Sequence, residues 1–268
     1  MAIAPTFDAA MLVLLSPSKT MASDAPSVQF EPSQPVFLQR AELLMSTLKK
    51  MGIGEIEALM KVSRSIAEDV QERCSKWSVP FTEENAMPAA YGFKGAVYTG
   101  LDTRSWTTED MEFAQDHLRI LSGLYGLLGP KDYMQPYRLE MGLKWPNTSE
   151  NKNLYSFWGS ELQLQIDQQA QGLIVDLASQ EYSKAAQLKS INQRVITPVF
   201  KDLVKGEYKA LMAYAKQARG AMAKFIIQNQ IINPEEMKGF EGMGYQWDAL
   251  LSEGDTWLFT RDKNSIAS

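Results

Sequence analysis

The stretch MLVLLSPSKT, residues 11–20, decides the fold class. Its first half, Met11–Leu15, is an unbroken apolar run, which is typical of a strand buried on both faces. The run ends abruptly in a polar loop that contains Ser16, Ser18 and Lys19. Because ligands of open α/β sheets bind beyond the carboxyl ends of their strands, this loop is a candidate anion site. It is not a phosphate-binding loop of the Walker A type, because the glycines are missing.

The rest of the chain alternates between strand and helix patterns. Further strands are expected over residues 96–99, 173–177, 194–200 and 256–261. Pro198 favours an edge or a bulge in the third of these. Helices are expected over residues 37–50, 55–72, 107–121 (capped by Thr107 or Thr108), 155–171 and 207–230. This order predicts an α/β (mixed α+β) fold, with a central mixed β-sheet covered by helices.

Length and composition favour a single domain. The 268 residues are 45% hydrophobic, and they contain neither an internal repeat nor a linker. We expect one domain over residues 11–268 and an N-terminal extension, without an assigned role, over residues 1–10. The extension does not have the pattern of a secretory signal, and no apolar run approaches the ~20 residues that cross a bilayer.

The scarcity of cysteine and histidine restricts the chemistry. Cys74 and His117 are the only residues of their types. One cysteine excludes an internal disulfide and fits a reducing compartment, so we expect a cytoplasmic protein. One cysteine and one histidine exclude metal sites built on several thiolates or imidazoles, so any metal would have to be bound by carboxylates. We assign no metal site and no cofactor. Cys74 is either a buried, incidental residue or a thiol activated by its basic neighbours.

The charge is segregated along the chain. The net charge of −5 argues against a generic basic nucleic-acid binder. A basic belt nevertheless runs through residues 184–224, where only Asp202 and Glu207 are acidic. Its cations are Lys184, Lys189, Arg194, Lys201, Lys205, Lys209, Lys216, Arg219 and Lys224. Such a belt in an acidic protein indicates an anionic partner held at one place.

Two elements could bring this charge to a phosphate. In the helix expected from residue 207, one side is apolar and the other is basic, which fits either a solvated surface or a phosphate-binding face. The basic side carries Lys209, Lys216, Arg219 and Lys224. Near residues 38–72, the sequence Gly52-Ile53-Gly54 lies between two helices. It predicts either an ordinary turn or a helix-hairpin-helix that binds DNA through Gly52, Gly54 and the neighbouring Lys49, Lys50 and Lys61.

A third group of residues mixes acids, bases and hydroxyls at strand ends and in loops. Its members are Ser16, Ser18, Lys19, Tyr137, Arg138, Glu140, Ser179, Glu181 and Lys184. They could form an anion or nucleotide site. A close mixture of acids and bases is typical of catalysis more than of simple binding, so an enzyme that acts on a nucleotide or nucleobase is a competing hypothesis.

A series of longer motifs covers about residues 11–261. In chain order they are LVLLSPSKT, FKGAVYTGL, HLRILSGLYGLLGP, DYMQPYRLEMG, LYSFWG, LASQEYSKA, TPVFKD and YAKQARGAMAKFII. These motifs, in this order, resemble those of the YaaA family of peroxide-stress proteins. The resemblance implies a mixed α/β fold with a basic cleft and a helix-hairpin-helix element. It also implies protection against hydrogen peroxide, limitation of free iron, and DNA binding. The cleft residues that it implies are Lys19, Lys94, Arg119, Arg138, Lys184, Lys201, Lys216 and Arg219.

The leading hypothesis is therefore a non-catalytic protein of the peroxide-stress response that binds duplex or branched DNA. It would protect DNA and limit free-iron damage indirectly, because the sequence lacks the ligands for direct iron storage. The alternative is the enzyme acting on a nucleotide or nucleobase in a polar cleft around Lys19, Arg138, Glu140 and Lys184. A scaffold for protein partners has only the acidic C-terminal region in its favour. We assign no catalytic residue.

Overall fold

The computed structural model describes residues 11–26, 30–145, 153–170 and 172–262, and the predicted extension at residues 1–10 lies outside them. The strands are β1 (Met11–Leu15), β2 (Thr20–Met21), β3 (Met87–Pro88), β4 (Phe93–Lys94), β5 (Leu118–Ser122), β6 (Gly126–Leu128), β7 (Tyr133–Met134), β8 (Leu173–Asp176), β9 (Arg194–Val204), β10 (Glu207–Lys209), β11 (Gln246–Trp247) and β12 (Thr256–Arg261). The α-helices are α1 (Leu38–Leu48), α2 (Ile53–Met60), α3 (Arg64–Lys76), α4 (Ala89–Gly92), α5 (Ala96–Leu101), α6 (Thr108–His117), α7 (Leu154–Trp158), α8 (Glu161–Gln169), α9 (Gln180–Ala185) and α10 (Met212–Gln228).

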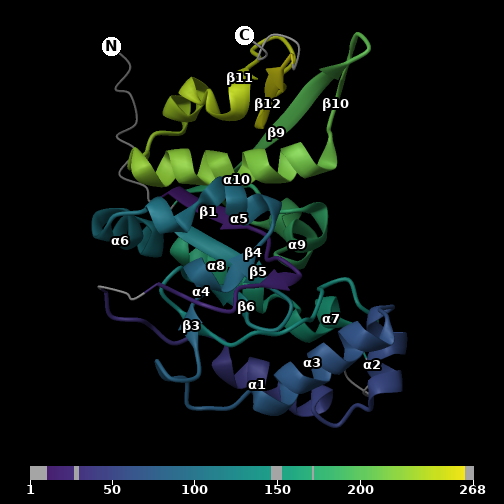
Figure 1. Cartoon of the computed structure of the whole chain (residues 1–268). Helices are drawn as coiled ribbons and strands as arrows, with labels where there is room; N and C mark the ends of the chain where they lie inside the picture. The colour runs from purple at the N-terminus through teal and green to yellow at the C-terminus, as the bar shows by residue number, and fades with distance from the viewer. Residues whose placement is uncertain (1–10, 27–29, 146–152, 171, 263–268) are drawn as a thin grey trace.

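The main sheet is mixed, and it is covered by helices as expected (Figure 1). Its strand order is β11-β12-β9-β8-β1-β5-β6, and β10 pairs with β9. Neighbouring strands from β12 to β5 run parallel, whereas β6, β10 and β11 run antiparallel to their partners. Among the helices of the described ranges, none is both long and apolar enough to cross a bilayer.

The apolar run that opens the chain's folded part is the centre of the core. Each of the five side chains of β1 is at most 1% exposed. β1 lies between β5 and β8, and α6 and α10 pack against it. A strand with neighbours on both edges and helices over it has no face in contact with water, which explains why its residues do not alternate between apolar and polar.

Helices α5 and α10 touch through their backbones. A Cβ atom at Gly220 of α10 would lie 1.8 Å from the carbonyl oxygen of Val97, and one at Gly100 of α5 would lie 2.0 Å from that of Gln217. Both distances are far below van der Waals contact, so only glycine fits at either position. Figure 1 shows α5 lying against α10. The contact fixes the position of α10, which carries two of the belt's cations into the site described below.

The strand predictions at residues 173–177, 194–200 and 256–261 are confirmed by β8, β9 and β12. The strand predicted at residues 96–99 is wrong. Gly95, with φ of 109°, reverses the chain there, and packing against α10 makes the segment the helix α5. The edge predicted from Pro198 is confirmed locally. β9 lies inside the sheet as a whole, but its pairing with β8 stops at Ile196, so only β12 pairs with it at Pro198.

The helix predictions located helices but not their ends. Lys61, with a left-handed φ of 51°, divides the segment 55–72 between α2 and α3, and Gly159, with φ of 50°, divides the segment 155–170 between α7 and α8. Thr107 caps α6 as predicted, by accepting the N–H of Asp110 (3.1 Å). The chain then continues as β5 after His117 instead of remaining helical to residue 121. Residues 207–209 form β10, so the helix begins at Met212.

Candidate functional site

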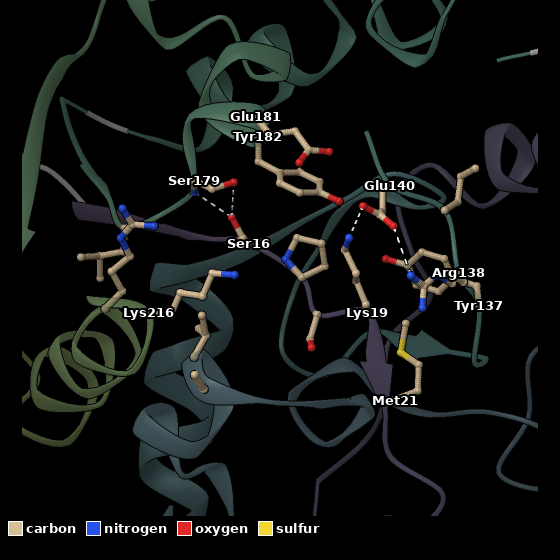
Figure 2. A pocket seen from close by; sticks show the side chains of 17 residues that line it. Ser16, Lys19, Met21, Tyr137, Arg138, Glu140, Ser179, Glu181, Tyr182 and Lys216 are labelled. Atoms are coloured by element: carbon tan, nitrogen blue, oxygen red, sulfur yellow. Dashed lines mark hydrogen bonds and ion pairs between the residues drawn. The ribbon is translucent and has the colours of Figure 1, made fainter. Parts of the chain in front are cut away.

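The carboxyl ends of β1 and β8 open into a pocket of about 300 Å³ (Figure 2). The loop after β1 contributes Ser16, Ser18 and Lys19, and the segment after β8 contributes Leu177 and Ser179. These strands are parallel neighbours, so their carboxyl ends lie at the same edge of the sheet. Open α/β sheets bind ligands at this edge, as expected from the sequence.

Hydrogen bonds between serines join the two loops. The hydroxyl oxygen of Ser16 accepts the backbone N–H of Ser179 (2.8 Å), and the Ser16 hydroxyl lies 3.3 Å from that of Ser179. The buried hydroxyl of Tyr98, from α5, donates to the carbonyl oxygen of Ser16 (3.0 Å). The two serines therefore join the loops after β1 and β8, Tyr98 joins the first of these loops to α5, and both serine hydroxyls lie at the pocket.

At one end of the pocket, a carboxylate offsets the positive charges of two basic residues. The carboxylate of Glu140 lies 2.5 Å from the Lys19 amino group and 3.5 Å from the Arg138 guanidinium. Lys19 is 60% exposed, whereas Arg138 and Glu140 are 18% and 22% exposed. Within the described part of the chain, Nε of Arg138 is buried without a hydrogen-bond partner. This end can bind an anion only in competition with Glu140.

The other end of the pocket carries Lys216 and Arg219 of α10. Figure 2 shows Lys216 on one side of Ser16, with Glu140 and Arg138 on the other. Over residues 11–26, 30–145, 153–170 and 172–262, neither Lys216 nor Arg219 forms an ion pair with a carboxylate. Burial lowers the pKa of Arg219, and the charge of Asp176 partly offsets this effect.

Asp176, the last residue of β8, is a buried carboxylate beside this cationic end. It accepts hydrogen bonds from the Ser183 hydroxyl (2.7 Å) and the Ala178 N–H (3.0 Å). Burial raises its pKa, while those hydrogen bonds and the charge of Arg219 act in the opposite direction. The negative charge of Asp176 favours the charged form of Arg219 without forming a close ion pair with it.

Part of the pocket wall is apolar. Met21, Val97, Leu139 and Leu177 contribute to it. Tyr137 also lines the pocket, and its hydroxyl is 2.7 Å from that of Ser122. Burial raises the pKa values of Tyr137 and Tyr182, so both hydroxyls are protonated at neutral pH. The pocket thus offers cations, hydroxyls and apolar surface to one ligand.

The structure brings most of the predicted site residues together and leaves others apart. Those that line the pocket are Ser16, Ser18, Lys19, Tyr137, Arg138, Glu140, Ser179, Glu181, Lys216 and Arg219. Those that do not are Lys49, Lys50, Gly52, Gly54, Lys61, Lys94, Arg119, Lys184, Lys201 and Lys209. The predicted anion site is thus assembled except for Lys184, whose amino group lies over the ring of Tyr155, 4.7 Å from its centroid.

Several residues outside the pocket have partners of their own. Lys49 donates to the carbonyl oxygen of Trp77 (2.6 Å), and Arg119 to the side chain of Gln169 (2.7 Å). Lys94 lies 3.9 Å from the carboxylate of Asp24. Lys209, predicted on the basic face of a helix, lies instead on β10 and pairs with Glu207 (2.7 Å).

The sequence interpretation missed Asp176 and the apolar wall. A signal for Asp176 was present, because an acidic residue near the carboxyl end of the apolar run LIVDL lies where ligands bind. Met21 and Val97 carried no such signal. Val97 was assigned to a strand, and it reaches the pocket only because α5 is a helix packed on α10.

Comparison with known proteins places this architecture in a family. The family described as peroxide stress protein YaaA matches residues 11–251. The chain belongs to the YaaA family. It is 45% identical over 258 residues to a UPF0246 protein of Colwellia psychrerythraea, with 95% of this chain and all of the relative covered. A UPF0246 protein of Aliivibrio fischeri is 45% identical over 259 residues, again with 95% of this chain and all of the relative covered. One of Saccharophagus degradans is 42% identical over 255 residues, covering 94% of this chain and 99% of the relative.

The family resemblance inferred from the motifs is therefore confirmed, and it links the chain to the peroxide-stress response. Over the residues that the structure describes, no group of three or more histidine, cysteine, aspartate or glutamate side chains is placed to hold a metal ion. In this YaaA-family chain, most residues of the predicted anion site lie together in the pocket at the carboxyl ends of β1 and β8.

Proposed function

We propose that this chain is a cytoplasmic DNA-binding protein of the response to hydrogen peroxide, and that its pocket receives a phosphate of the DNA backbone. The observation that carries the proposal is the pair Lys216 and Arg219. They lie three residues apart on α10, line the pocket beside the hydroxyls of Ser16 and Ser179, and have no close carboxylate partner among the described residues. Lysine and arginine supply most of the affinity of proteins for nucleic-acid backbones.

A protein bound in this way would shield DNA from the radicals that iron and peroxide produce. The proposal requires no iron to be held by the protein itself, so an effect on free iron would be indirect. The family's description as a peroxide stress protein supports this biological setting.

The helix-hairpin-helix is a weaker candidate for the DNA contact. α1 and α2 are joined by a short turn, as the prediction requires. The N–H of Gly52, however, donates to the carboxylate of Glu55 (2.8 Å), so an internal anion already occupies the position that a phosphate would take. We therefore expect the pocket to contribute more affinity than Lys49, Lys50 or Lys61.

A second candidate function is catalysis on a nucleotide or nucleobase in the same pocket. The observation in its favour is the other end, where Glu140 lies between Lys19 and Arg138 next to an apolar wall. A volume of about 300 Å³ is within the range of small-molecule sites. Lys184, which was predicted for this cleft, does not line it.

The Glu140→Gln variant separates the two candidates. If the pocket binds a DNA phosphate, removing this negative charge frees Lys19 and Arg138, and affinity for duplex or branched DNA should rise at low salt. The measurement is fluorescence anisotropy with labelled DNA, with unlabelled nucleoside monophosphates as competitors. Binding of the monophosphates by a wild-type protein that fails to bind DNA would contradict the proposal and favour the enzyme.

A further inference from the structure

Strand β9 continues beyond its pairing with β8, at the edge of the sheet at which the pocket opens, and β12 stays paired with it as far as Asp202. β8 ends at Asp176, and its pairing with β9 stops at Ile196. β9 continues for eight more residues to Val204, a distance of about 26 Å at the usual rise of a strand. β10 pairs with this extension, and the chain then enters α10. The β9–β10 hairpin therefore extends from the same edge of the sheet as the pocket, and Figure 1 shows it projecting past α10 on the side of β11 and β12.

The tip of the hairpin is a two-residue turn. Lys205 and Gly206 join the paired residues Val204 and Glu207, and both have positive φ (52° and 83°). Two central residues with positive φ are the mark of a type I′ turn, which favours asparagine at the first position and glycine at the second. Lysine is not a residue that this turn prefers, so its presence at the tip has no explanation in the local backbone.

The hairpin presents two lysines that the function proposed above can use. Lys205 is exposed at the tip, and Lys201 is half-buried four residues earlier, where β9 still pairs with Thr260 of β12. Among the described residues neither has an ion-pair partner, whereas Lys209 pairs with Glu207. Lys201 lies on the face that also carries Tyr208, because Leu203, two residues on, pairs with Tyr208. Asp202 points to the other face, where it is buried against Arg261 (2.5 Å).

We propose that the β9–β10 hairpin is a second contact for the DNA backbone, in which Lys201 and Lys205 bind phosphates next to the one held in the pocket. The inference rests on the proposed function. DNA is the expected partner because a projecting hairpin with unpaired cations is complementary to a continuous row of phosphates. A small ligand bound in the pocket does not provide such a row. Because β9 continues in the direction in which β8 ends at the pocket, we expect a DNA duplex bound at the pocket to extend to the hairpin.

The test is the Lys201→Gln/Lys205→Asn variant. Asparagine suits the type I′ turn, so the variant removes two charges without breaking the hairpin, and its thermal unfolding should match that of the wild type. The control is Arg64→Gln/Lys76→Gln, which removes the same charge from α3, an element at the opposite end of the molecule from the hairpin (Figure 1). For each protein, the affinity for duplex DNA is measured as a function of salt concentration.

The slope of log affinity against log salt should become shallower by about 0.9 for each lysine that contacts a phosphate, and the control should keep the wild-type slope. A hairpin variant with the wild-type affinity and slope would overturn this inference and leave the proposed function standing. A wild-type protein that binds no DNA at all would overturn both.

Discussion

Asp176 should make the stability of the protein depend on pH. Burial raises its pKa above the value of an unfolded chain, so its contribution to stability is largest at low pH and falls as the pH rises through the folded pKa. As the pH rises from 4 to 8, the free energy of unfolding of the wild type should therefore fall relative to that of Asp176→Asn. The size of this fall is about 1.4 kcal/mol per unit of pKa difference. Urea unfolding at several pH values measures it, and a difference that is constant with pH would contradict this account.

Cys74 should not respond to peroxide in the folded protein. The residue is buried, and burial raises the pKa of its thiol to about 11, against the weaker influence of Lys49 and Arg73. Peroxide attacks the thiolate, which is scarce at neutral pH under these conditions. Mass spectrometry after peroxide treatment should find Cys74 unmodified in native protein and oxidised in protein unfolded beforehand. Oxidation of Cys74 at similar rates in both states would show that it can act as a sensor.

Single residues also show which parts of the site could be predicted from the sequence. Ser16, Ser18 and Lys19 were predicted because they follow an apolar run, and strand β1 leads to them at the pocket. Arg138 and Glu140 were predicted only as members of a polar loop. Their pairing, and the position of Glu140 between two cations, depend on side-chain geometry that residue order does not encode. Asp176 was missed because it lies within the apolar run of β8 and not among the polar residues that follow it.

Among the secondary-structure elements, the strands were easier to predict than the helix ends. Buried strands such as β1 and β8 carry their apolar character in the local sequence. α10 was predicted to start at residue 207 because residues 207–209 also suit a helix, but the turn at Lys205 and Gly206 pairs them with β9. α5 was taken for a strand because its packing partner, α10, lies more than 100 residues later in the chain. Such long-range contacts override local propensity.

The contact between α5 and α10 gives a prediction about two glycines. In Gly220→Ala the new Cβ would meet the Val97 carbonyl oxygen, so the helices must separate, and a loss of stability of about 1–3 kcal/mol is expected from overpacking. Gly54→Ala is the matched control. Its Cβ would have nothing within 4 Å, and α2 should gain about 0.5–1 kcal/mol.

Thermal or urea unfolding of both variants measures these effects. Because α10 carries Lys216 and Arg219, Gly220→Ala should also weaken DNA binding, while Gly54→Ala should not. Equal stability of the two variants would show that α5 and α10 do not pack as closely as described.

At the scale of the whole molecule, the site joins segments that are far apart in the chain. The parallel pairing of β1 with β8 brings Ser16 to Ser179, and a sheet with strands in these places made such a meeting predictable. The approach of Lys216 and Arg219 was not predictable, because it depends on how α10 crosses the sheet and on the glycine contact with α5. The basic belt was visible in the sequence, but the structure divides it between the pocket, the hairpin and residues with partners of their own.

The central claim is that Lys216 and Arg219 bind DNA phosphates in the pocket. The measurement that tests it most directly is duplex-DNA affinity as a function of salt for the wild type, Lys216→Ala/Arg219→Ala and the charge-matched control Arg64→Ala/Lys76→Ala. Arg64 and Lys76 are exposed residues of α3 and lie in ion pairs with Glu68 and Glu72. We predict that the wild type and the control share a steep loss of affinity with salt, and that the slope for the α10 variant is shallower by about 0.9 per lost phosphate contact. An α10 variant whose affinity and slope equal those of the wild type would contradict the account.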